Sequence, residues 1–259
     1  MTNNEVISRS DANYFHAWRS IVAAKEGGEV VEGDGVLIAN SGMPVAWFNI
    51  GFITRRLAEP EGAIRRIAAY FDERHMPFII RLREGLDPDA ERAAEGQGIA
   101  YADTVPGMVL DAMPPAADAT RELEIRTVDD TGAMQHHVDV IAQSFEMPLD
   151  FARQFVSEDL IRIPDVELYV GYVGGQPVAS SALVASHRTA GVYNVGCLDS
   201  HRRRGFGAAM TWHAVRRGAD IGCSIASLQA SEMGRPVYER MGFRLVAPYR
   251  TFMRPEHHD

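Results

Sequence analysis

The chain has 259 residues, of which 46% are hydrophobic and 24% charged, and it carries a formal net charge of −9 at pH 7. These values are typical of a folded globular protein with one large domain or two ordinary ones. An acidic chain is a poor match to a nucleic-acid-binding protein, and without an apolar run of about 18 residues no membrane span is expected.

The N-terminus and the cysteines favour a cytoplasmic protein without a bound metal. Residues 1–5 contain neither a basic stretch nor an apolar core, so they do not resemble a signal peptide. Cys197 and Cys223 lie in apolar surroundings, and no cysteine and histidine cluster has zinc spacing. The terminal pair His257 and His258 reads as the end of the chain rather than a metal site.

The first part of the chain alternates helical periodicity with short apolar runs. The pattern predicts helices over 12–24, 61–74 and 88–96, strands over 35–40, 44–54 and 77–82, and one or two strands over 98–111. The stretch that follows is rich in Pro and Ala and has no apolar period, as linkers do. The sequence therefore predicts one domain over 1–112, a linker over 113–120 and a second domain over 121–259.

The second part begins with a strand and two helices and continues as a meander. The predicted elements are strand 122–127, helices 129–145 and 148–160, strands 166–173, 176–187 and 189–198, helix 208–219, strand 224–230, helix 234–241 and strand 243–253. Asp129 or Asp130 is the expected cap of the first helix, and Gly174 with Gly175 the expected hairpin turn.

A basic, glycine-containing turn between a strand and a helix is the most informative motif. Residues 202–208 read Arg-Arg-Arg-Gly-Phe-Gly-Ala and follow an apolar strand. Glycine lets the backbone approach an anion, and the first amides of a helix lack internal acceptors and attract phosphate oxygens. Arginines add positive field at the same point. The pattern predicts a pyrophosphate pocket.

Other interpretations of the same residues fit less well. A short basic run can bind nucleic acid, but the acidic chain offers no wider basic surface. A plain helix start with solvated arginines remains the simplest alternative. No Gly-Lys-Ser/Thr follows, which excludes a P-loop, and the dinucleotide pattern Gly-x-Gly-x-x-Gly is incomplete.

Two motifs in order carry a family resemblance. Arg-x-x-Gly-x-Gly at 202–207 and Tyr-Glu-x-x-Gly-Phe at 238–243 resemble the signatures of the GCN5-related N-acetyltransferases, the GNAT family. The resemblance covers roughly 121–254. It implies an α/β fold with a mixed sheet, the acyl-CoA N-acyltransferase fold, and acetyl-CoA as cofactor.

The resemblance also implies roles for individual residues. Amides from Arg203 to Ala208 would hold the pyrophosphate, a strand-end amide at Cys197 or Leu198 would face the thioester carbonyl, and Tyr238 would be the general acid. Ser231 would contact the cofactor arm or cap the next helix, and Phe206 would point into the core. The implied cofactor site is Cys197, Leu198, Arg202, Arg203, Arg204, Gly205, Phe206, Gly207, Ala208, Ser231 and Tyr238.

The general base has several candidates. Glu146 follows the first helix of the second part, in a region that lines the acceptor side in relatives. Asp150, Glu167 and His187 are rivals, and ordered water can also remove the proton of an amine. We expect Glu146 to be the base.

The first part loosely repeats the strand and helix order of the second but lacks its chemical motif. Residues 55–62, Arg-Arg-Leu-Ala-Glu-Pro-Glu-Gly, stand where the glycine turn would be, with no paired glycines and with acids in place of the phosphate site. This predicts a degenerate tandem copy; an unrelated α/β domain is the alternative.

The expected function is therefore transfer of an acetyl group from acetyl-CoA to a primary amine of a small molecule or peptide. The alternatives are a non-catalytic acyl-CoA sensor or scaffold, and an aminoacyl or longer-chain acyl transferase on the same fold. We expect neither nucleic acid nor membrane as a partner, and a monomer more than a homodimer, because tandem domains can satisfy their interface internally.

Overall fold

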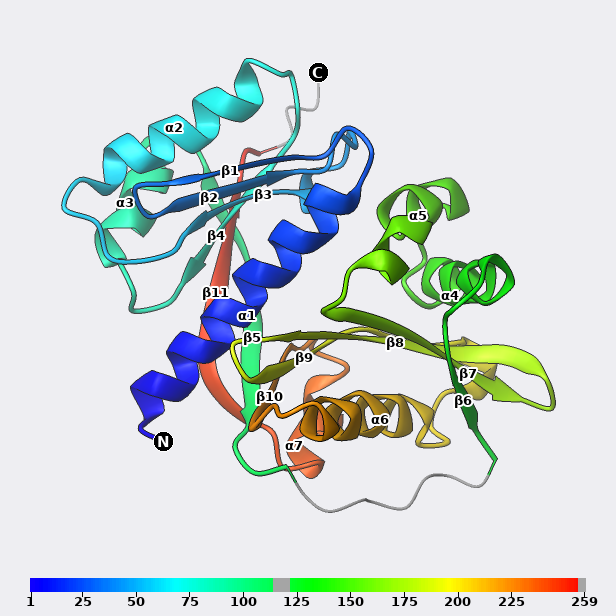
Figure 1. The fold of residues 1–259 in the computed structure, drawn as a ribbon. Coiled ribbons are helices and arrows are strands. Elements are labelled where there is room, and N and C mark those ends of the chain that lie inside the picture. The colour runs from blue at the N-terminus through cyan, green and yellow to red at the C-terminus, as the bar shows by residue number, and fades with distance from the viewer. Residues whose placement is uncertain (114–121, 256–259) are drawn as a thin grey trace. The chain divides into compact units, whose positions relative to one another are not determined.

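The computed structural model describes residues 1–113 and 122–255 of the chain (Figure 1). The linker expected over 113–120 therefore lies outside the described residues except for its first residue. The terminal histidines, His257 and His258, also lie outside them. Among the described residues, no helix is both long and apolar enough to cross a membrane. The same residues contain no group of three or more His, Cys, Asp or Glu placed to hold a metal ion.

The chain forms two compact units, and each unit includes a terminal segment from the opposite end of the sequence. One unit comprises Met1–Ala17 with Met108–Arg244, and the other Trp18–Gly107 with Leu245–Asp259. We call them the 108–244 unit and the 18–107 unit. This division differs from the contiguous domains expected from sequence, because each terminal segment packs with the unit formed by the other half of the chain. Periodicity shows that a segment is a helix or a strand, but not which sheet it joins.

The 108–244 unit contains neighbouring strands of the sheet in the order β10-β9-β8-β7-β6. Its strands are β6 Glu124–Thr127, β7 Val166–Val173, β8 Gln176–Ser186, β9 Thr189–Cys197 and β10 Ile225–Gln229. Strands β6 to β9 pair antiparallel in succession, whereas β10 pairs with β9 in parallel. Parallel neighbours require a crossover, which α6 (Phe206–Asp220) supplies. The predicted mixed α/β fold is confirmed.

Helices lie on both faces of this sheet. In Figure 1, α6 lies on one face of β8 and β9, and α4 (Thr131–Ser144) lies on the other. Asp130 caps α4 as expected, since its Oδ1 accepts the amide of Ala133 at 2.7 Å. The next helix is shorter than predicted: α5 ends at Phe155, and a 3-10 helix, Glu158–Arg162, follows after a break. Val156 interrupts the helix with a non-helical ψ of 83°.

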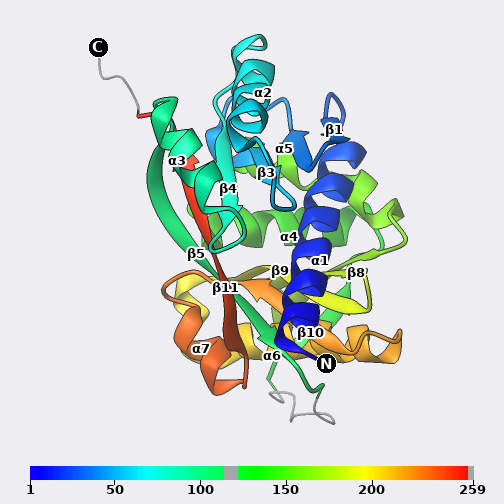
Figure 2. The same ribbon diagram turned by 90° about the vertical axis from the view of Figure 1, so that its left-hand side faces the viewer.

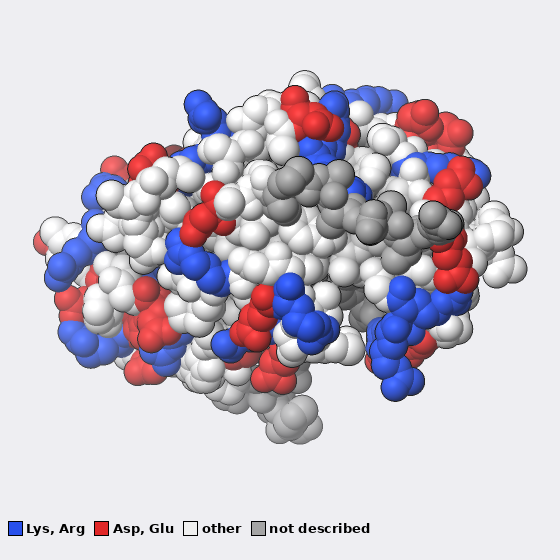
Figure 3. All heavy atoms as spheres, turned by 90° about the horizontal axis from the view of Figure 1, so that it is seen from below, with Lys and Arg blue, Asp and Glu red and all other residues white. Residues whose placement is uncertain are grey.

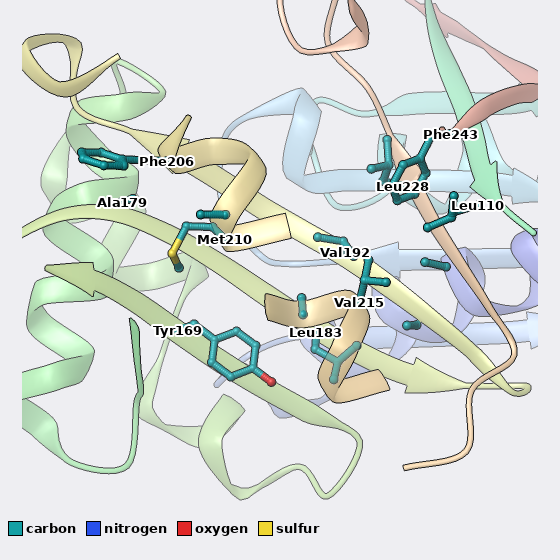
Figure 4. Packing of buried hydrophobic residues seen from close by; sticks show 14 of the residues in the cluster. Leu110, Tyr169, Ala179, Leu183, Val192, Phe206, Met210, Val215, Leu228 and Phe243 are labelled. Atoms are coloured by element: carbon teal, nitrogen blue, oxygen red, sulfur yellow. The ribbon is translucent and has the colours of Figure 1, made fainter. Parts of the chain in front are cut away.

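The core of the unit joins α6 to the strands. Phe206, Met210 and Val215 of α6 pack with Val192 of β9 and Leu228 of β10 (Figure 4). Phe206 is 1% exposed, which confirms that its side chain points into the core. This packing fixes the first turn of α6 against the strands, so the turn that precedes it is held in place.

The 18–107 unit contains the other sheet segment, in the order β1-β2-β3-β4-β11. Its strands are β1 Glu29–Gly33, β2 Val36–Asn40, β3 Asn49–Ile53, β4 Ile79–Arg83 and β11 Arg244–Met253, which pairs with β4. Helices α2 (Pro60–Asp72) and α3 (Pro88–Gly96) pack together on one core (Figure 2). As in the 108–244 unit, a helix joins two parallel strands, here β3 and β4.

Several other elements of the first part differ from the ranges predicted from the sequence. Helix α1 spans Asn3–Ala24 and so begins nine residues before the expected start at residue 12. Strand β1 was not expected, because its sequence Glu-Val-Val-Glu-Gly is short and half polar. A 3-10 helix, Ala46–Phe48, precedes β3 where a longer strand was predicted. Strand β5, Ala100–Leu110, is a single strand that starts in one unit and ends in the other.

Candidate functional site

Strands β9 and β10 pair over a short distance and then part. Their paired residues are Thr189 with Ile225, Ala190 with Ala226 and Gly191 with Ser227. Beyond these, residues 192–197 of β9 and 228–229 of β10 have no mutual pairing in the described part of the chain. We call this opening the fork. A sheet that opens in this way leaves backbone donors and acceptors for a ligand at the ends of its strands.

A bulge shapes the β9 side of the fork. The register with β8 shifts between Ser180 and Ala182, and Asn194 has a left-handed φ of 51°. The Ser180 hydroxyl donates to the Asn194 carbonyl at 2.9 Å, which holds the bulge. Bulges re-aim the backbone groups that follow them.

The amides of Cys197 and Leu198 point in opposite directions. Leu198 donates its amide to the Val178 carbonyl at 3.0 Å and is therefore not free for a ligand. Successive residues of an antiparallel strand alternate in direction, so the amide of Cys197 faces away from β8, toward the fork. Either amide was expected to face the thioester. The amide of Cys197 is available for that role, whereas the amide of Leu198 is already bonded to β8.

The turn before α6 has the conformation that an anion cradle needs. Gly205 adopts φ 81° and ψ 3°, and Arg203 has φ 64°. The first amide with a backbone acceptor is that of Ala209, which donates to Gly205 at 2.9 Å. Within residues 1–113 and 122–255, no group accepts a hydrogen bond from the backbone amides of residues 203–208. Six adjacent amides at a helix N-terminus form a site for phosphate oxygens.

The three arginines of the turn differ in their surroundings. Arg202 turns inward, donating to the Cys197 carbonyl at 3.3 Å and pairing with Asp199 at 2.8 Å. Arg204 pairs with Glu122 and lies over the Phe206 ring. Arg203 is exposed, and its side chain contacts no partner in the described chain. Acidic and basic side chains lie side by side over the face drawn in Figure 3.

Tyr238 lies on α7 (Arg235–Arg240), where its side chain packs against the core that α6 shares with the strands. Burial raises the pKa of Tyr238 above its usual 10, and the nearby Thr211 side chain offsets part of that shift. The ring packs edge-on against Phe243, with centroids 5.9 Å apart. A Cβ at Gly234 would lie 3.0 Å from Cε2 of Tyr238, so glycine makes room for the ring. The arrangement keeps a neutral phenol, which can donate a proton.

Ser231 caps the turn into α7, since its hydroxyl accepts the Gly234 amide at 3.1 Å. The side chain is exposed, and its hydroxyl proton can still reach another acceptor. The structure therefore supports the capping role expected as an alternative and is compatible with a cofactor contact.

Glu146 ends helix α4 in a left-handed conformation, with φ 52°. The following amide, of Met147, reaches back to Ala142 at 2.9 Å, which completes a Schellman cap. Glu146 is exposed, and its carboxylate has no partner in the described part of the chain. A structural role in ending the helix explains its position without catalysis.

The rival bases are engaged elsewhere or lie at a turn. Glu167 accepts from Arg217 at 2.8 Å and from the Tyr169 hydroxyl at 2.8 Å. Asp150 pairs with Arg153 at 3.6 Å. His187 is exposed and forms the turn between β8 and β9 with Arg188, both at positive φ. None of these contacts places a base at the fork.

Sequence reasoning missed the polar residues on the face of the sheet opposite α6. Asn13 of α1 is 0% exposed and accepts the Tyr193 hydroxyl at 2.8 Å. Ser227 is also 0% exposed, and Gln229 ends β10. A polar residue inside an apolar pattern was the available signal, but its meaning depends on partners far along the chain.

The start of helix α2 in the 18–107 unit offers a different environment from the start of α6. Glu59 is the N-cap of helix α2, which begins with Pro60 and Glu61, and proline has no amide hydrogen to donate. A hollow of about 630 Å³ lies between the N-terminus of α2 and helix α3. Its lining includes Arg65 and Arg92 together with Glu59 and Glu61. Negative side chains at this point disfavour a phosphate.

The fork, the amide-lined turn and the crossover helix define the acyl-CoA N-acyltransferase class of folds. Residues 100–234, just over half of the chain, match the family model described as an acetyltransferase (GNAT) domain. The chain belongs to the GNAT acetyltransferase family, which confirms the resemblance noted from the two motifs. Comparison with curated proteins gives no match.

Solved structures share the fold at low identity. A GCN5-related N-acetyltransferase from Kribbella flavida superposes with a TM-score of 0.74 at 19% identity, covering 96% of each chain. One from Sphaerobacter thermophilus gives 0.63 at 16% identity, covering 85% of this chain and 78% of its own. A conserved protein of unknown function from Staphylococcus epidermidis gives 0.63 at 14% identity, covering 88% and 95%. These likenesses extend across both units and concern the fold alone.

Proposed function

We propose that the protein is an acetyl-CoA-dependent N-acetyltransferase that acts on a primary amine. One observation carries the proposal: the unaccepted amides of 203–208 follow the strand whose Cys197 amide faces the fork, after one short 3-10 helix, Asp199–His201. Phosphate at one end and a thioester carbonyl at the other are the two groups that such donors suit. The residues present therefore fit acetyl-CoA, which supplies the acetyl group as a thioester.

The chain's own groups account for the steps of transfer. The amide of Cys197 stabilises negative charge as the amine nitrogen bonds to the carbonyl carbon. As the carbon–sulfur bond breaks, Tyr238 gives its proton to the thiolate and later regains one from solvent. Water, or Glu146, takes the proton that the amine loses. No metal or redox group is needed for this balance.

We also propose that the 18–107 unit is a degenerate copy of the same fold that does not bind the cofactor. Its helix–strand order repeats that of the 108–244 unit, with α2 joining parallel β3 and β4. The acids and proline at the start of α2 replace the glycine turn. The expected stoichiometry is one acetyl-CoA per chain.

Calorimetric titration of acetyl-CoA into the wild type and the Gly205→Glu variant tests the proposal. Glutamate would put bulk and negative charge against the pyrophosphate, so binding should be lost. Gly205→Ala is the matched control, because it carries the strain of a left-handed φ without the charge. Binding at one site that the control keeps and Gly205→Glu loses supports the assignment. Absence of binding to the wild type would contradict it, and binding without acetyl transfer to any amine would favour a sensor.

A further inference from the structure

Gln229 carries a buried carboxamide with no partner. It is the last residue of β10, two residues beyond the final pair with β9. Both its Oε1 and its Nε2 are buried, and neither bonds to any group in residues 1–113 or 122–255. A primary amide offers two donors and two acceptors, and leaving their hydrogen bonds unmade in the interior is unfavourable. Such a group calls for an explanation beyond packing.

The direction of this side chain follows from the alternation of the strand. Ala226 and Leu228 belong to the core under α6, and Figure 4 shows Leu228 beside Phe243. Ser227 and Gln229 therefore point to the opposite face. Ser227 is 0% exposed, and its hydroxyl also lacks a partner among the described residues.

The neighbouring strand and helix complete a polar lining on that face. Gly191 and Tyr193 of β9 share it, since Ala190 and Val192 belong to the α6 side. Asn13 of α1 bonds to Tyr193, and Ser10, one turn earlier, is 1% exposed with an unpartnered hydroxyl. The face holds hydroxyls and carboxamides rather than carboxylates at these five positions. Uncharged hydrogen bonding is what such a lining can offer.

This inference rests on the proposed function, in which the cofactor and the acyl acceptor approach the fork from different faces of the sheet. The amides of 203–208 lead into α6, which packs on one face of the sheet. We assign the attacking amine to the opposite face, where Gln229 points. We propose that Gln229 binds the acyl acceptor, and that the acceptor is an uncharged α-amino amide, such as an amino acid amide or a peptide N-terminus.

The donor and acceptor of one carboxamide match this substrate class. Oε1 of Gln229 accepts a hydrogen from the neutral amine, which aims the nitrogen lone pair away from Gln229. Nε2 donates to the carbonyl oxygen on the adjacent carbon. A simple alkylamine satisfies only the first contact and leaves a buried donor unpaired. Sites built on hydrogen bonds reject analogues that lack them more strongly than apolar pockets do.

The test compares two probes, glycinamide and ethylamine, in the wild type and in Gln229→Met. Methionine keeps the volume of the side chain and removes its polar atoms, and Gln176→Met, at an exposed position, is the matched control. The ratio of kcat/KM for the two amines is compared between variants, so their different basicities cancel. Affinity for acetyl-CoA is measured by calorimetry, and stability by urea unfolding.

We expect the wild type to favour glycinamide and the Gln229→Met variant to lose that preference by about tenfold or more. Affinity for acetyl-CoA should stay within about twofold, and the urea midpoint should not fall, since an unpaired polar group has been removed. An unchanged ratio, or a lower affinity for acetyl-CoA, overturns the inference. Failure of the wild type to bind acetyl-CoA would instead remove the proposed function itself.

Discussion

The hydroxyl of Tyr193 on β9 donates a 2.8 Å hydrogen bond to Oδ1 of Asn13 on α1, joining residues 180 positions apart. The same amide donates through Nδ2 to the Val184 carbonyl at 2.8 Å. A Cβ at Gly191 would lie 2.0 Å from Oδ1 of Asn13, so only glycine allows this approach. One buried carboxamide thus fastens the N-terminal helix to the β8–β9 hairpin.

Replacing Asn13 should destabilise the protein. In Asn13→Leu, the Tyr193 hydroxyl and the Val184 carbonyl lose their partner in the interior, so we expect the free energy of unfolding to fall by about 3 kcal/mol. Urea unfolding followed by circular dichroism measures the change. Asn4→Leu, on the exposed side of α1, is the control, and equal effects at both positions would contradict the anchoring role.

Arg203 should contribute charge to cofactor binding, whereas Arg202 should contribute structure. Arg203→Ala is expected to weaken acetyl-CoA affinity by about three- to tenfold and to reduce its dependence on salt. Arg203→Gly, which suits the φ of 64°, separates charge from backbone strain and should weaken binding equally. Arg202→Ala should mainly lower the urea midpoint, because it frees the Cys197 carbonyl and Asp199. If Arg203→Gly restored binding, strain and not charge would be responsible.

Tyr238→Phe should slow acetyl transfer and spare binding. Loss of the general acid is expected to reduce kcat by about a hundredfold, with acetyl-CoA affinity within about twofold of wild type. Tyr101→Phe, at an exposed hydroxyl bonded to Thr104, is the control. Because burial raises the pKa of Tyr238 above 10, its proton stays bound below that pH, and kcat should show no alkaline fall from this group before pH 10. Wild-type turnover in the variant would remove Tyr238 as the acid.

His137 should make stability fall on mild acidification. Its ring lies fully buried on α4, where Nδ1 bonds to the Tyr169 carbonyl at 3.0 Å and Nε2 is unpartnered among the described residues. Burial lowers the pKa of His137 from 6.5 to about 4. Between pH 4 and pH 6.5, His137 therefore binds a proton in the unfolded chain but stays neutral in the folded chain.

The stability linked to His137 is complete above pH 6.5 and is lost progressively as the pH falls toward 4, by about 3 kcal/mol at most. His137→Asn keeps a donor for Tyr169 and cannot titrate in this range. Urea unfolding at pH 4.5 and pH 7 should therefore show a smaller difference for His137→Asn than for the wild type. The same difference in both proteins would exclude His137 as its source.

Local chemistry explains what could be predicted from the sequence. The glycine turn at Gly205, the helix after it and a cap at Asp129 or Asp130 depend on a few neighbouring residues, and each was expected from the sequence. The site was less predictable where the direction of a backbone amide decides whether it is free to bind a ligand. Whether the amide of Cys197 or of Leu198 is free depends on the register with β8, and a bulge near Asn194 changes that register.

Long-range pairing accounts for what the sequence did not reveal. Asn13 and Gln229 look alike as polar residues in apolar segments, yet one has its partners on β8 and β9 and the other has none in the described chain. Arg202, Arg203 and Arg204 read as one basic run, but only Arg203 is left without a protein partner there. Such distinctions arise only when distant segments meet.

The placement of β11 has a consequence for how the molecule is made. This strand pairs with β4, through Thr251 opposite Arg81, although the two strands lie far apart in the sequence. During synthesis β4 is therefore made well before β11, and until β11 arrives β4 presents a bare edge. Exposed strand edges promote aggregation. A chain that lacks β11 would therefore keep this edge of its sheet open to other strands.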